Sequence, residues 1–223
     1  MSRFLNRAEA GKALAEAVAD KHYDDPVILA LPRGGVPVAI ELVRVLKAPL
    51  DLVMVRKIGA PGQQELAVAA VVNGDDPQIV VNEGIMAVFG LTDEDIEQMS
   101  KSRLDEIRRR REVYLGGRPQ VPVKGRTAVV VDDGIATGAT TRASLKAVRK
   151  RDPARLVLAV PVGPADVVEE LRDEVDEVIC LSTPSPFQAI GLHYVDFGQT
   201  PDEEVVQLLD EAAELTGQGK EAD

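Results

Sequence analysis

The segment VVVDDGIATGATT, residues 129–141, decides the fold of this chain and most of its chemistry. It continues an apolar run, residues 127–131, which reads as a buried strand and ends on two acids, Asp132 and Asp133. Gly134 allows a turn, and a helix is expected from about residue 139 to residue 151. A strand, a glycine-containing loop and a helix in this order are typical of a ligand-binding loop in an α/β protein.

The loop suits a phosphate monoester, because small residues let backbone N–H groups approach an anion and hydroxyls add donors. The small residues are Gly134, Ala136, Gly138 and Ala139, and the hydroxyl donors are Thr137, Thr140 and Thr141. Asp132 and Asp133 would repel a phosphate, so we expect them to bind ribose hydroxyls or a magnesium ion. An Asp-Gly turn capped by threonines is the simpler alternative. Neither the Walker A string nor the G-x-G-x-x-G string occurs.

Outward from this loop, apolar runs alternate with amphipathic segments. Strands are expected at 27–31, 50–55, 68–72, 78–81, 155–160 and 177–181, and helices at 7–20, 36–46, 91–115, 164–172 and 201–215. This alternation predicts an α/β fold with one central parallel sheet and helices on both faces. We expect a single domain over residues 1–216, with a helical insertion at about 83–118 and a disordered tail at 217–223.

Composition and charge argue against several classes of function. The chain has 223 residues and a net charge of −11, which argues against binding to nucleic acid or to an anionic membrane. The run Arg108 to Arg111 is therefore interpreted as a solvated helix end. The only cysteine, Cys180, lies in an apolar run and reads as a buried thiol. No apolar run of membrane-spanning length and no secretory leader is visible, so a cytoplasmic location is expected.

Residues 129–141 resemble the 5-phosphoribosyl-1-pyrophosphate (PRPP) signature of type I phosphoribosyltransferases. The segment LALPRGGVPVA, residues 29–39, resembles the pyrophosphate loop of that family, and residues 55–71 resemble its strand end and flexible lid. The resemblance covers about residues 4–212 and is strongest to an uncharacterised bacterial and archaeal subgroup. It implies the type I fold, with a small hood over the acceptor at residues 182–200.

The resemblance implies transfer of a phosphoribosyl group from magnesium-bound PRPP to a nitrogenous base, with release of pyrophosphate, as in nucleotide salvage. Asp132 and Asp133 would orient the ribose and face the metal, and residues 134–141 would bind the 5-phosphate. The residues expected around pyrophosphate are Arg33, Gly34, Gly35, Arg56 and Lys57. Residues 58–67 would form a mobile loop that closes over PRPP, and Glu65 in it is a weak candidate for a general base.

The sequence leaves several questions open. Arg33 alone reads as a surface arginine in a turn, and Arg56 with Lys57 as a common basic pair at a strand end. The hood gathers Phe187, His193, Tyr194 and Phe197, which either cap the acceptor or seal the sheet edge. A PRPP-sensing regulator and a sugar-phosphate binding module are the rival functions. The sequence names no acceptor and leaves a homodimer open.

Overall fold

The computed structural model describes residues 3–72 and 77–218, and its centre is a parallel sheet of five strands. The strands run in the order β2-β1-β6-β7-β8. Their bounds are β1 (Pro26–Ala30), β2 (Leu50–Leu52), β6 (Thr127–Val131), β7 (Arg155–Val162) and β8 (Glu177–Ser182). The predicted parallel sheet is therefore confirmed, with the acid loop after its central strand.

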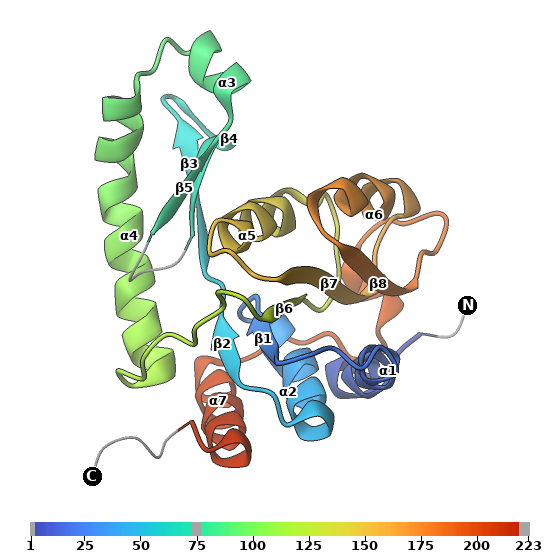
Figure 1. Ribbon diagram of the computed structural model, residues 1–223. Coiled ribbons are helices and arrows are strands. Elements are labelled where there is room, and N and C mark those ends of the chain that lie inside the picture. The colour runs from blue at the N-terminus through green and yellow to red at the C-terminus, as the bar shows by residue number, and fades with distance from the viewer. Residues whose placement is uncertain (1–2, 73–76, 219–223) are drawn as a thin grey trace.

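Helices cover both faces of this sheet, as predicted (Figure 1). One face carries α1 (Arg7–Ala19), α2 (Gly35–Leu46) and α7 (Asp202–Thr216), and the other carries α5 (Ala139–Arg149) and α6 (Ala165–Leu171). Successive strand residues point to opposite faces. Accordingly Val129 packs with the first set of helices, whereas Val130 packs with the second. Both are fully buried, as are most residues of β1 and β7.

A second, antiparallel sheet extends from the edge of the first, and the sequence did not predict it as a sheet. It consists of β3 (Val55–Ala60), β4 (Gln63–Val72) and β5 (Gln78–Val81), followed by α3 (Glu83–Val88) and α4 (Asp93–Leu115). These elements form an arm that projects from the main body (Figure 1). Thr92 caps α4 through a capping box with Asp95, as the run of acids at its start suggests.

The irregular loop predicted at 58–67 is wrong, because β3 and β4 pair there as a hairpin, whereas its mobility and its closure over PRPP stay predictions. Ile58 and Ala60 are buried, and Gly62 has a φ of +74°, which provides the turn. The glycines and the proline that suggested a loop thus make the tip of a hairpin. Glu65 lies on β4, but its side chain is outside the described part of the structure.

Gln218, at the end of the described residues, lies against the edge of the main sheet. Gly217 closes α7 in a left-handed conformation, and the Gln218 side chain accepts a hydrogen bond of 3.1 Å from the Leu50 amide. The disorder predicted at 217–223 is therefore wrong for Gly217 and Gln218, and residues 219–223 lie outside the described part. In the described ranges no helix is long and apolar enough to cross a membrane.

Candidate active site

The acid pair lies at the carboxyl end of β6, where ligands bind in sheets of this kind. Asp133 is 7% exposed, and its amide donates a 2.8 Å hydrogen bond to Asp132 Oδ1. Burial raises the pKa of the Asp132 carboxyl well above its ordinary value, and the neighbouring charge of Asp133 raises it further. Burial also raises the pKa of Asp133, although a nearby arginine opposes the shift. The acid pair therefore lies where burial makes ionisation of the two carboxyls unfavourable.

The loop after the acid pair connects β6 to α5. A Cβ on Gly134 would lie 2.7 Å from Ile190 Cγ2 and 3.0 Å from Val162 Cγ1, so only glycine fits there. Gly138 is the N-cap of α5, and Thr141 is buried in its first turn. The remaining expected phosphate-binding residues, Ala136, Thr137, Ala139 and Thr140, are exposed at this helix start. The arrangement offers solvent-facing hydroxyls and backbone groups at a positive helix end.

The expected pyrophosphate loop follows β1, the strand beside β6, and it packs directly on the acid pair. A Cβ on Gly34 would lie only 2.1 Å from Asp133 Oδ2, and one on Gly35 would lie 2.7 Å from the Val131 carbonyl oxygen. The Leu31 amide also donates a 2.9 Å hydrogen bond to Val131 O. The two glycines are therefore required for the close approach of two loops that lie about a hundred residues apart in the sequence.

Arg33 is held by a carboxylate from the start of α7. Its Nη1 lies 3.4 Å from Asp202 Oδ1, and Tyr114 Oη donates a 2.6 Å hydrogen bond to the same oxygen. The hydrogen bond from Tyr114 and the charge of Arg33 lower the pKa of the Asp202 carboxyl. The Arg33 side chain is 36% exposed, so it stays accessible to an anion from solvent.

Arg56 and Lys57 lie on β3 of the arm. Arg56 Nε pairs with Glu106 Oε1 of α4 at 2.8 Å, and its Nη1 donates a 2.9 Å hydrogen bond to Val55 O. Lys57 is exposed. The structure thus brings Gly34 and Gly35 to the acid loop, whereas Arg33 pairs with Asp202 and Arg56 faces α4. The pyrophosphate role of Arg33, Arg56 and Lys57 stays a prediction.

Sequence reasoning missed Arg7, which pairs with the acid loop from the start of α1. Its Nε lies 2.7 Å from Asp133 Oδ2, and both side chains are nearly buried. The same guanidinium donates a 2.7 Å hydrogen bond to Gly198 O and lies 4.0 Å from the centre of the Phe197 ring. No local pattern marks this residue, because all three contacts are with residues more than a hundred positions away in the sequence.

The sequence left two roles open for the aromatic residues of the hood, capping the acceptor or sealing the sheet edge. Tyr194 is 2% exposed, and its hydroxyl donates a 2.6 Å hydrogen bond to Asp133 O, so it seals and fixes the acid loop. The Phe187 and His193 rings stack at 4.9 Å, and Phe197 stacks on Tyr194 at 5.0 Å. Phe187, His193 and Phe197 remain partly exposed, and Phe197 is linked to the acid pair through Arg7.

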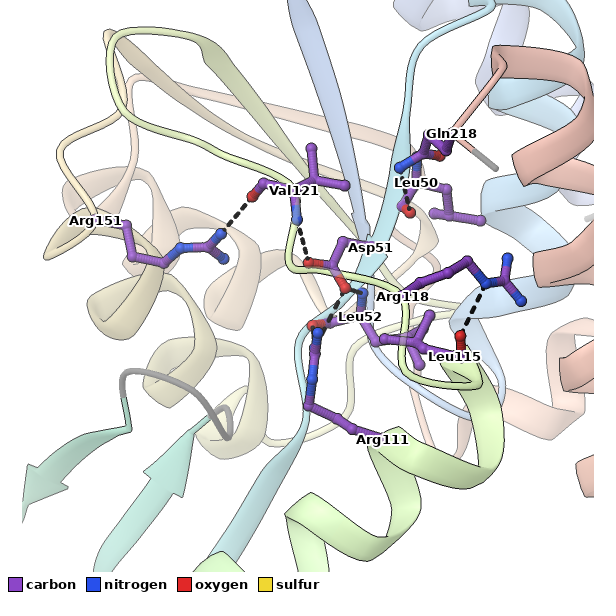
Figure 2. Close-up of polar contacts among 9 residues, drawn as sticks. All are labelled: Leu50, Asp51, Leu52, Arg111, Leu115, Arg118, Val121, Arg151 and Gln218. Carbon is purple, nitrogen blue, oxygen red and sulfur yellow. Dashed lines mark hydrogen bonds and ion pairs between the residues drawn. The ribbon is translucent and has the colours of Figure 1, made fainter. Parts of the chain in front are cut away.

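The arginine run on α4 is not uniformly solvated, which corrects the interpretation of Arg108 to Arg111 as a solvated helix end. Arg108 pairs with Asp105 on the surface, but Arg111 is 6% exposed and lies 3.2 Å from Asp51 Oδ1. Figure 2 shows this buried pair between α4 and β2, where Asp51 also accepts a hydrogen bond from the Val121 amide. Arg111 therefore fastens the arm to the main sheet.

Comparison with known proteins agrees with this geometry. A family model described as phosphoribosyl transferase domain matches residues 3–196. The chain belongs to this family. Proteins of two Mycobacterium tuberculosis strains, CDC 1551 and H37Rv, each named "Putative phosphoribosyl transferase", are 44% identical over 212 residues. The match covers 95% of this chain but 47% of each relative, so the chain spans about half their length.

The fold is also that of a crystal structure from Thermus thermophilus. It has a TM-score of 0.82 and 43% sequence identity, and the match covers 94% of this chain and 98% of that one. The central sheet with helices on both faces is therefore the type I phosphoribosyltransferase fold expected from the residues around 129–141.

Proposed function

We propose that this phosphoribosyltransferase-family protein binds magnesium-PRPP and transfers its phosphoribosyl group to a nitrogenous base or similar acceptor, releasing pyrophosphate. The observation that carries the proposal is the contact between the two loops. Gly34 lies so close to Asp133 that the expected pyrophosphate loop and ribose-binding acids form one surface. A ligand that carries a phosphate, a ribose and a pyrophosphate matches the order of the α5 start, the acid pair and Arg33.

The residues act mainly by positioning and by balancing charge. Thr137 and Thr140, with the backbone at the start of α5, hold the 5-phosphate. Asp132 and Asp133 accept hydrogen bonds from the ribose hydroxyls. Arg33 neutralises the negative charge that grows on pyrophosphate as its bond to ribose C1 breaks and the acceptor bonds to that carbon. The glycine loop allows the leaving group to lie close to the backbone.

The donor set fits a magnesium ion that the substrate shares. Within the described residues, no group of three or more His, Cys, Asp or Glu side chains could hold a metal by itself. Magnesium is usually bound through one or two carboxylates together with substrate phosphates, and the adjacent Asp132 and Asp133 can supply this. When bound, the ion would neutralise pyrophosphate charge.

Two measurements test the proposal. Calorimetry with magnesium-PRPP should show binding that the double substitution Asp132→Asn and Asp133→Asn largely removes; unchanged affinity would exclude the assigned site. A panel of purine, pyrimidine and other nitrogenous acceptors should then reveal PRPP-dependent pyrophosphate release. If PRPP binds but no acceptor raises pyrophosphate above the hydrolysis background, the protein senses PRPP rather than transferring its sugar.

Arg33→Ala separates chemistry from binding. A hydrogen bond to a charged group contributes about 1.5–3 kcal/mol, so turnover should fall by roughly tenfold to a hundredfold if the bond strengthens in the transition state. PRPP affinity should fall less. Arg44→Ala is a matched control, because Arg44 pairs with Glu211 on the outer side of α2 and α7. Equal losses in the two variants would contradict a role at the leaving group.

A further inference from the structure

Arg7 is fixed more completely than any cation expected from the sequence to bind the ligand. Its Nε pairs with Asp133, its Nη1 donates to Gly198 O, and its guanidinium covers the Phe197 ring. Its side chain is 13% exposed, against 36% for Arg33. An arginine that serves an anion from solvent needs accessible donors, as Arg33 has. Arg7 is instead turned toward the protein's own carboxylate.

The contacts of Arg7 join the hood to the acid loop. Phe4, three residues before Arg7, pairs with Tyr194 through a parallel β-bridge, and their ring centres are 5.8 Å apart. Tyr194 donates its hydroxyl hydrogen bond to the Asp133 carbonyl. Asp133 is thus held twice from the hood side, through its carboxylate by Arg7 and through its backbone by Tyr194. Gly34 covers the carboxylate from the other loop.

The contact with Arg7 restricts the orientation of the Asp133 carboxylate. A guanidinium donates from a rigid plane, so it fixes the rotation of a carboxylate that it binds. Phe197 and Gly198 in turn fix the guanidinium. The ionisable groups close to Asp133 are Arg7 from α1, Asp132 beside it in the loop, and the Tyr194 phenol from the hood, whose pKa is raised by burial so that it stays neutral. Arg7 is the one cation among these three.

We propose that Arg7 is a positioning residue, which orients the Asp133 carboxylate for the ribose hydroxyls and ties that carboxylate to the hood. This inference rests on the proposed function, since it assumes that Asp133 binds ribose. It assigns Arg7 to the ribose part of the ligand and not to pyrophosphate. Two ligands that differ in the ribose phosphate therefore distinguish the role: magnesium-PRPP contains it, and magnesium-pyrophosphate does not.

The experiment compares both ligands by calorimetry on the full chain. Arg7→Gln should weaken magnesium-PRPP binding by about tenfold or more, because a charge-assisted contact to Asp133 is lost. Magnesium-pyrophosphate keeps the metal contact of the acid pair but lacks the ribose hydroxyls, so its binding should fall clearly less, by about threefold at most. Arg7→Lys should recover part of the PRPP affinity, because it restores the charge without the rigid plane.

The fold supplies a matched control at the opposite end of the sheet. Arg155 also pairs with a carboxylate, Glu177 at 2.8 Å, and lies 5.4 Å from the centre of an aromatic ring, Tyr23. Arg155→Gln should leave both affinities unchanged. If Arg7→Gln does not fold, Phe197→Leu keeps the charge and removes the ring beneath it, and should weaken PRPP binding by roughly twofold to fivefold.

The outcomes are separable. A wild-type protein that does not bind PRPP refutes the proposed function itself. If wild type binds PRPP and the Arg7 and Phe197 variants bind it equally well, the inference about Arg7 is refuted alone. Equal weakening of both ligands in a variant, or no recovery with lysine, would show a general disturbance of the site and would also overturn the positioning role.

Discussion

Asp51 and Asp133 are both buried aspartates that pair with an arginine from a distant helix, yet their surroundings differ. Asp51 receives the Leu52 amide, the Val121 amide and Arg111 at 2.7, 3.0 and 3.2 Å. Asp133 receives Arg7, but it lies beside a second carboxyl and beneath Gly34, and burial raises its pKa. A buried carboxylate with a full set of donors stabilises the fold, whereas one crowded by another acid indicates a binding site.

The largest expected effect is the loss of stability when Asp51 is replaced. Asp51→Ala leaves Arg111 buried without its carboxylate and removes the acceptor of two amides. The free energy of unfolding should fall by about 3–5 kcal/mol, the usual cost of breaking a buried pair from one side. Urea unfolding followed by circular dichroism measures this. A loss below about 1 kcal/mol would show that water satisfies the Arg111 site after all.

The second expected effect is steric and lies between the two loops. Gly34→Ala places a Cβ against the Asp133 carboxylate, and overpacking of this kind costs about 1–3 kcal/mol. PRPP affinity should fall with stability, because Asp133 must move. Gly84→Ala is the control, since the nearest atom to its new Cβ is 3.5 Å away. That variant should stay within about 0.5 kcal/mol of wild type. Equal behaviour of the two variants would mean that the loops separate readily.

The third expected effect is a gain in stability, opposite in sign to the effect of replacing Asp51. Asp132→Asn removes a crowded charge but keeps an oxygen for the Asp133 amide, so stability at neutral pH should rise by about 1 kcal/mol. PRPP binding should weaken at the same time. A variant that loses stability in the manner of Asp51→Ala would show that Asp132 has a structural role as well.

The pH dependence sharpens that test. The raised pKa of Asp132 means that the folded protein binds its proton more tightly than the unfolded chain does. Wild-type stability therefore falls as the pH rises from the ordinary aspartate range toward the raised pKa. Asparagine has no such proton, so the advantage of Asp132→Asn should grow over this interval and then level off. A difference that is constant with pH would contradict the raised pKa.

The smallest expected effect is on amide hydrogen exchange in the arm. Amide exchange should be slow at residues 69–72 of β4, which pair with β3 on one side and with β5 on the other. It should be fast at Gly62 in the hairpin tip, and PRPP should slow it there if the hairpin closes over the ligand. Uniformly fast exchange from residue 58 to residue 72 would instead restore the mobile loop expected from the sequence.

The sequence predicts the main sheet well because its strands are apolar runs of β-branched residues. Helix starts carry capping residues: Asn6 accepts a hydrogen bond from the Glu9 amide at the start of α1, and Thr92 caps α4. The sequence also predicts that the loops of Asp132, Asp133 and Gly34 follow strands of the parallel sheet, and these strands are neighbours. The chemistry assigned to these residues stays a prediction. The hairpin escaped prediction, since Gly59, Pro61 and Gly62 resemble an irregular loop. Arg7, Asp51 and Arg111 escaped it for another reason: the partners lie 60 to 126 positions away, and only packing brings them together.

The tyrosines have a practical consequence. The chain contains no tryptophan and three tyrosines, so its near-ultraviolet emission comes from three phenols. Tyr114 donates to Asp202, the partner of Arg33, and Tyr194 donates to Asp133. Tyr23 donates to Glu177 at the amino end of β8, far along the sheet from both loops. Two chromophores therefore adjoin the candidate site and one serves as an internal reference, which allows ligand titrations to be followed optically without a label.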